Sequence, residues 1–127
     1  EHRLGRSRLD FLLRPRDDRE GGPPLLLEVK SVTLVEEGVA LFPDAVTARG
    51  ARHVRELAEH VRAGSHRAAV LFVVQRPGAS RVLAAREIDP AFADALAGAR
   101  EAGVRVLGRR CRVEADRVVL GDSIPAG

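Results

Sequence analysis

Three residues in the first quarter of the chain have types and spacing that could support catalysis. Glu28 and Lys30 are two residues apart in an otherwise apolar stretch, and Asp10 lies in an earlier stretch of alternating polarity. Residues i and i+2 of a strand project from the same face of a sheet, so Glu28 and Lys30 are expected side by side. If Asp10 faces the same way on a paired strand, two carboxylates and one ammonium group converge.

A divalent cation would stabilise such a cluster, because isolated charges are costly to bury. Hard cations such as Mg²⁺ prefer carboxylate and carbonyl oxygens. We therefore expect Asp10 and Glu28 to bind Mg²⁺ or Mn²⁺. A water molecule held by the ion could attack a phosphodiester, and Lys30 could position that water or stabilise the developing charge.

The lysine is informative because Lys30 is the only lysine among 21 Lys and Arg residues. A position that keeps lysine in such a chain indicates a need for a compact ammonium group with an accessible proton. Purely structural interpretations of these residues also remain open. Glu-x-Lys is common as a solvated edge or a salt bridge, and Asp10 could simply pair with Arg8 or with another arginine.

Composition limits the class of protein. The 127 residues are 45% hydrophobic and 31% charged, which predicts a single domain over 1–127 with one core. The net charge of +3 gives only a mild preference for polyanions. All four aromatic residues are Phe, so we expect no stacking platform for single-stranded nucleic acid. The single cysteine, Cys111, excludes an intramolecular disulfide and argues against a cysteine zinc site.

The same features predict a location in the reducing cytoplasm, without a membrane anchor. The longest apolar run, 68–74, is too short to span a bilayer, and no charged-then-apolar leader opens the chain. The sequence holds no methionine, so we expect a processed product or an excised domain with sequence missing upstream. No small-molecule cofactor is expected.

Hydrophobic periodicity predicts an α/β fold with a mixed sheet and helices on its faces. The first two predicted strands are expected to pair antiparallel, and the continuous apolar run in 67–75 predicts a central strand buried on both faces. The predicted strands are 8–13, 25–32, a hairpin over 33–42, 67–75, 104–113 and a short 117–120; the predicted helices run from Thr47 to before Gly64 and from Pro90 to Gly103.

The first predicted helix is amphipathic, with an apolar face of Val46, Val54, Leu57, Ala58 and Val61 and a polar face of Arg49, Arg52, His53, Arg55 and His60. Backbone amides at a helix start favour anions, so Arg49, Arg52 and His53 could hold DNA phosphates, together with Arg8. A solvated helix face is the alternative, and we favour it for Arg52. Thr47 is the expected helix cap; Asp44 could cap the helix or belong to the site.

Several stretches resemble one protein family along essentially the whole chain. Ser7–Phe11, Leu27–Thr33, and Phe42–Gly50 followed by His53 are similar to the sugar fermentation stimulation protein A (SfsA) family. The similarity continues in three further stretches, Ala69–Gln75, Ile88–Pro90 and Ala102–Val104.

This resemblance implies a restriction-endonuclease-like fold of the PD-(D/E)XK type, whose Asp and Glu-x-Lys motif falls on Asp10, Glu28 and Lys30. It also implies that the peptide carbonyl of Val29 joins the metal site and that Glu1 holds the place of an additional acidic residue. Members of the family carry an upstream OB-fold-like domain that this sequence does not contain.

Three functions remain open at this point. The first is a Mg²⁺-dependent nuclease-like domain acting on DNA. The second, also implied by the resemblance, is a non-hydrolytic DNA-binding module in a regulator of sugar (maltose-type) metabolism genes. The third is a structural domain whose charged cluster is a salt-bridge network.

Overall fold

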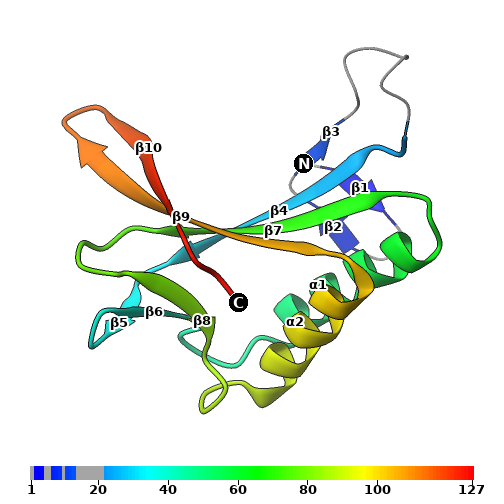
Figure 1. Cartoon of the computed structure of the whole chain (residues 1–127), viewed down its shortest axis with the longest axis horizontal. Helices are drawn as coiled ribbons and strands as arrows, with labels where there is room; N and C mark the ends of the chain where they lie inside the picture. Colours follow the sequence, from blue (N-terminus) through cyan, green and yellow to red (C-terminus); the bar gives the residue numbers. More distant parts are fainter. Residues whose placement is uncertain (1, 5–6, 10, 14–21) are drawn as a thin grey trace.

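The computed structural model describes residues 2–4, 7–9, 11–13 and 22–127, and gives side chains for residues 22–127 apart from positions 112, 113 and 118. Asp10 and Glu1 lie outside the described residues. The elements, shown in Figure 1, are β1 (His2–Leu4), β2 (Ser7–Leu9), β3 (Phe11–Leu13), β4 (Leu25–Val32), β5 (Leu34–Glu36), β6 (Val39–Phe42), α1 (Ala48–Arg62), β7 (Arg67–Val74), β8 (Arg81–Ala84), α2 (Pro90–Ala102), β9 (Arg105–Glu114) and β10 (Arg117–Ile124).

The main sheet has five strands in the order β10-β9-β7-β4-β3. Its three inner strands, β4, β7 and β9, are parallel, and the outer strands β3 and β10 run antiparallel to their neighbours. The predicted mixed sheet is confirmed, as is the antiparallel pairing of the first two predicted strands, in which Phe11 lies opposite Leu27. A second sheet has the order β5-β6-β8, and β1 pairs with β2.

The core lies between one face of the main sheet and the two helices, which pack against each other below the sheet in Figure 1. Leu26 and Val32 of β4 and Phe72 of β7 are at most 1% exposed, and they form one cluster with Leu57 of α1 and Phe92 of α2. This arrangement follows from the two-residue period of strands, which sends alternate side chains to the same face.

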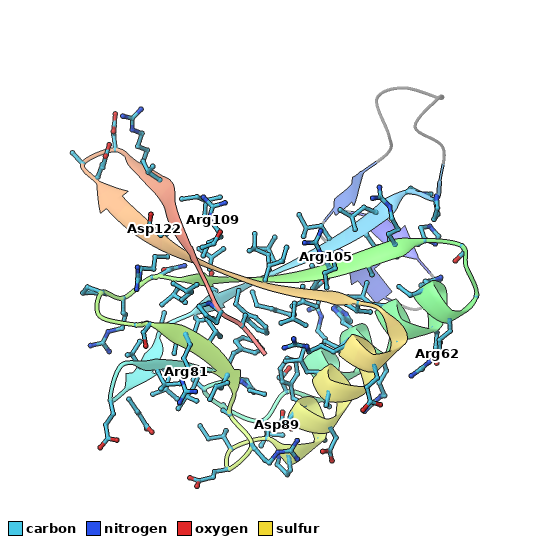
Figure 2. The ribbon with its side chains drawn as sticks, viewed as in Figure 1. Arg62, Arg81, Asp89, Arg105, Arg109 and Asp122 are labelled. Atoms are coloured by element: carbon cyan, nitrogen blue, oxygen red, sulfur yellow. The ribbon has the colours of Figure 1, made fainter. Side chains whose placement is uncertain are left out.

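The prediction that β7 is buried on both faces and covered by helices is wrong. Val70, Phe72 and Val74 are buried, whereas Leu71 and Val73 are only partly buried. The other face of the sheet lines a groove of about 780 Å³, to which Leu25, Leu27, Ala69, Leu71, Leu107 and Arg109 contribute. Figure 2 shows Arg109 on the side of the sheet opposite the helices. The run is apolar throughout because one half faces the core, while Ala69 and Leu71 of the other half line this groove.

Both helices begin and end at the residues that their sequences indicate. Thr47 caps α1, because its hydroxyl accepts a hydrogen bond from the Gly50 amide at 2.9 Å. Pro90 occupies the first turn of α2, and Gly103 ends that helix in the left-handed conformation at φ 108°. Val46 does not join the apolar face of α1 as predicted, since it precedes the cap and is 74% exposed.

Other differences from the predicted elements concern short or terminal strands. Strand β8 (Arg81–Ala84) had no predicted counterpart, and β10 extends to Ile124 instead of ending at Leu120. Within the described residues, neither helix is long and apolar enough to cross a membrane.

Candidate metal and nucleic-acid site

Glu28 stands near the middle of β4 on the face that packs against the helices. Two other side chains on that face, Leu26 and Val32, are 0% and 1% exposed. Glu28 itself is 3% exposed, which is rare for a carboxylate unless it is paired or bound to a cation. The period of the strand therefore places an acidic group inside an apolar layer.

Lys30 lies next to Glu28 on the same face of β4. Its Nζ atom is 3.0 Å from Oε1 of Glu28, and its side chain is 17% exposed. The lysine thus occupies the boundary between the buried face and solvent, where it partly neutralises the buried carboxylate and still reaches the surface. A long flexible side chain suits this position, because it can keep its charged end near water.

His53 reaches the same carboxylate from α1. Its Nδ1 atom is 3.2 Å from Oε1 of Glu28, and the residue is 2% exposed. The prediction that His53 lies on the polar face of the helix is therefore wrong. His53 lies three residues after Gly50 and four before Leu57, which are both buried, so the helical period turns its ring inward. That spacing was visible in the sequence and could have placed it correctly.

The two carboxylate oxygens of Glu28 differ in their surroundings. Oε1 contacts both Lys30 and His53, whereas Oε2 is buried and has no hydrogen-bond partner among the residues that the structure describes. A buried carboxylate oxygen without a partner is energetically costly. Such an atom fits the donor chemistry of a hard divalent cation, which binds carboxylate oxygens.

The described residues supply only part of a metal-binding set. They contain no group of three or more His, Cys, Asp or Glu side chains placed to hold a metal ion. Two of the predicted ligands, Asp10 and Glu1, fall outside the described part of the chain. Val29 is half-buried between Glu28 and Lys30 in β4.

The other predicted site residues lie around the start of α1. Arg49 and Arg52 are both exposed in the first turns of the helix. Asp44 is exposed in the segment between β6 and α1, and it is Thr47 that caps the helix. Arg8 belongs to β2, where the structure describes only the backbone.

One buried aspartate that the sequence reasoning did not single out fixes the start of α1. Asp89, which Figure 2 labels at the beginning of α2, is 2% exposed. Its Oδ2 accepts a hydrogen bond from the Thr47 amide at 2.8 Å, and its Oδ1 accepts one from the Phe92 amide at 3.0 Å. An aspartate immediately before Pro90 is a recognisable helix-start signal.

These hydrogen bonds also set the acidity of Asp89. The amides of Thr47 and Phe92, and to a smaller degree that of Ala91, hold the pKa of this carboxyl below its usual value, against the opposing effect of burial. Asp89 therefore acts as a charged structural acceptor that ties the two helix starts together.

Comparison with known proteins places the chain in a family. A family profile described as "Sugar fermentation stimulation protein RE domain" matches residues 1–117, which is most of the chain. The chain belongs to the sugar fermentation stimulation protein family. Relatives named "Sugar fermentation stimulation protein homolog" include one from Shewanella loihica, 48% identical over 119 residues, and one from Moorella thermoacetica, 48% identical over 121 residues.

The match to these SfsA-family relatives covers 94% of the chain but only 49% and 50% of their length. The chain thus spans about half the length of the relatives it matches. A solved structure, that of Pyrococcus furiosus SfsA in complex with Ca²⁺, superposes with a TM-score of 0.88 at 31% identity. It covers all of this chain and 53% of the solved one. The mixed α/β fold is therefore that of an SfsA protein.

Proposed function

We propose that the chain is a restriction-endonuclease-like domain of the PD-(D/E)XK type that binds DNA and hydrolyses phosphodiester bonds with Mg²⁺ or Mn²⁺. The observation that carries the proposal is Oε2 of Glu28, a buried oxygen without a partner among the described residues, beside Lys30. A structural salt bridge alone leaves the desolvation of this oxygen uncompensated, whereas a bound cation compensates it. The family profile, described as that of an RE domain, supports the same assignment.

In this proposal Glu28 supplies one carboxylate ligand, Asp10 a second, and the carbonyl of Val29 a third oxygen. The pairing of Phe11 with Leu27 supports the assignment, because Asp10 and Glu28 are the sequence neighbours of that pair. The Pyrococcus furiosus relative was solved in complex with Ca²⁺, which is another hard cation that selects oxygen ligands.

The residues around Glu28 would divide the catalytic work. A bound Mg²⁺ ion lowers the pKa of water and stabilises charge on a phosphoryl oxygen. Lys30, partly exposed and 3.0 Å from Glu28, donates hydrogen bonds to the scissile phosphate or orients the attacking water as negative charge develops. Glu28 keeps the ammonium group in place between turnovers through its Oε1 atom.

The exposed arginines of α1 would hold the DNA backbone. Arg49 and Arg52 lie in the first turns of the helix that also carries His53, so the helix links a solvent-facing basic surface to the buried site. Arginine suits this role because its planar group donates to phosphate oxygens in pairs. These contacts carry no sequence information and serve to position the substrate.

The testing experiment incubates the chain with supercoiled plasmid and with single-stranded DNA in Mg²⁺, Mn²⁺ or EDTA, beside Lys30→Ala. Metal-dependent nicking that disappears in the variant supports the proposal. Binding of DNA without cutting, unchanged by the substitution, would instead support a non-hydrolytic DNA-binding module of a sugar-metabolism regulator. Neither binding nor cutting would leave the charged cluster a structural element.

A further inference from the structure

The contacts of Glu28 are asymmetric in a way that matters for any ligand it binds. One oxygen, Oε1, has two donors, and the other, Oε2, has none among the described residues. The terminal torsion of a glutamate side chain is soft, so a carboxylate without a fixed partner would rotate easily. Something must therefore hold Oε1 toward the donors and leave Oε2 for the ligand.

The two donors differ in their ability to do this. Lys30 has a flexible side chain that is 17% exposed, and its ammonium group can leave Oε1 for a substrate phosphate. The His53 ring is 2% exposed and rises from the second turn of α1, whose start is fixed by Thr47 and Asp89. His53 is thus the more constrained of the two donors.

We infer that His53 is a positioning residue, whose Nδ1–H holds Oε1 of Glu28 and thereby presents Oε2 to the divalent cation. The inference rests on the proposed metal-binding function of Glu28. An ionised carboxylate only accepts hydrogen bonds, so in this role His53 is the tautomer that carries its proton on Nδ1, 3.2 Å from Oε1. Partners that orient metal-ligating carboxylates in this way change metal affinity by about 10- to 100-fold when removed.

The identity of the ring nitrogen makes the inference testable by matched substitutions. In asparagine the side-chain nitrogen falls close to the position of Nδ1 in histidine, whereas in glutamine it falls close to Nε2. His53→Asn therefore keeps a donor for Glu28, and His53→Gln does not keep it at the same place. If His53 only filled space, the shorter side chain of His53→Asn would give no higher metal affinity than that of His53→Gln.

The experiment measures Mn²⁺ affinity by electron paramagnetic resonance or calorimetry on the whole chain. The samples are wild type, His53→Asn, His53→Gln and His53→Ala, with Glu28→Gln to identify the site. His60→Asn, the same substitution two turns further along α1, is the control. Each is measured below its own unfolding temperature. We expect affinity to fall about 10- to 100-fold in His53→Gln and His53→Ala, and to stay near wild type in His53→Asn and His60→Asn.

Each result has a distinct meaning. If wild type binds Mn²⁺ through Glu28 and both His53→Asn and His53→Gln bind equally well or equally poorly, the positioning role is wrong while the proposed metal site stands. If wild type binds no Mn²⁺, or binds it equally after Glu28→Gln, the proposed metal site fails and the role of His53 fails with it. Should His53→Ala not fold, the comparison of His53→Asn with His53→Gln decides the question alone.

Discussion

The imidazole of His53 and the carboxylate of Glu28 meet inside the protein, with Nδ1 and Oε1 3.2 Å apart and both residues at most 3% exposed. The two residues are 25 positions apart in sequence and belong to different elements, β4 and α1. Because Lys30 contacts the same oxygen, one carboxylate connects strand β4, helix α1 and the boundary with solvent. Without a bound cation, burial of this carboxylate should lower the stability of the folded protein.

Glu28→Gln is expected to leave the metal-free protein about as stable as wild type, within roughly 1 kcal/mol. The amide retains an oxygen that accepts from His53 and Lys30, and the variant no longer buries an ionised group. Addition of Mn²⁺ at about 100 times its dissociation constant should stabilise wild type by about 2.7 kcal/mol and leave the variant unchanged. Thermal unfolding in EDTA and in Mn²⁺ measures both effects. An equal shift in the two proteins would contradict the assignment of Glu28 as a ligand.

Lys30→Arg separates the positive charge from the ammonium group. The variant keeps a cation beside Glu28, so we expect Mn²⁺ affinity close to that of wild type. Nicking of plasmid should fall by about 10²- to 10³-fold, because the larger planar group cannot take the place of the ammonium at the reacting phosphate. Single-turnover rates at saturating metal test this, and an unchanged rate would show that charge alone suffices.

Arg49→Ala and Arg52→Ala test whether the start of α1 contacts DNA. If each arginine neutralises one phosphate, each substitution should reduce the slope of log affinity against log salt by about 0.9. Fluorescence anisotropy with duplex DNA at several salt concentrations, in EDTA, gives the slope without cleavage. Arg62→Ala is the matched control, since Arg62 is exposed at the opposite end of the same helix (Figure 2). Equal slopes in all proteins would place DNA elsewhere.

Asp89→Asn is expected to lower stability at neutral pH by about 1–2 kcal/mol, since one of two main-chain donors then faces an amide NH₂ group. Amide hydrogen bonds lower the pKa of Asp89 in the folded protein below its value in the unfolded chain. The charged carboxylate therefore contributes its full stabilisation of the fold above the pKa of the unfolded chain, and this stabilisation is lost as the pH falls through the pKa of the folded protein. The gap between wild type and variant should therefore narrow below about pH 4.

Urea unfolding between neutral and acidic pH measures that gap. Asp94→Asn serves as the control for a loss of charge on α2, because Asp94 is largely exposed and pairs with Arg86. A gap that stayed constant down to the lowest pH would show that Asp89 does not act through its charge.

Much of the fold was predictable because its signals are local. Periodicity located both helices, and Thr47, Pro90 and Gly103 marked their ends through side-chain and backbone preferences that act within one turn. The alternation of β4 likewise placed Glu28 and Lys30 on one face before any contact was known.

The features that the sequence did not predict depend on contacts between distant segments of the chain. The inward turn of His53 was missed because a histidine among arginines is typical of a polar helix face. Its buried partner, Glu28, lies on a different element, β4, 25 positions earlier in the sequence. The apolar positions Leu71 and Val73 predicted a second helical layer, yet both are only partly buried and Leu71 lines a groove, since hydrophobicity does not specify what covers a surface. Strand β8 was missed because it is short and pairs with β6, whose residues lie 42 positions earlier, as in the pair of Val39 and Arg81.

The double hydrogen bonding of Asp89 has a consequence for genetics. Its carboxylate holds the amide of Thr47, six residues before His53, so its loss would disturb the site without touching it. A random screen for loss of function would recover Asp89 substitutions together with those of Glu28 and Lys30. The two groups would separate by temperature. Growth in the cold would rescue the Asp89 alleles, which fail through instability, and, if the proposed function holds, would not rescue the Glu28 and Lys30 alleles.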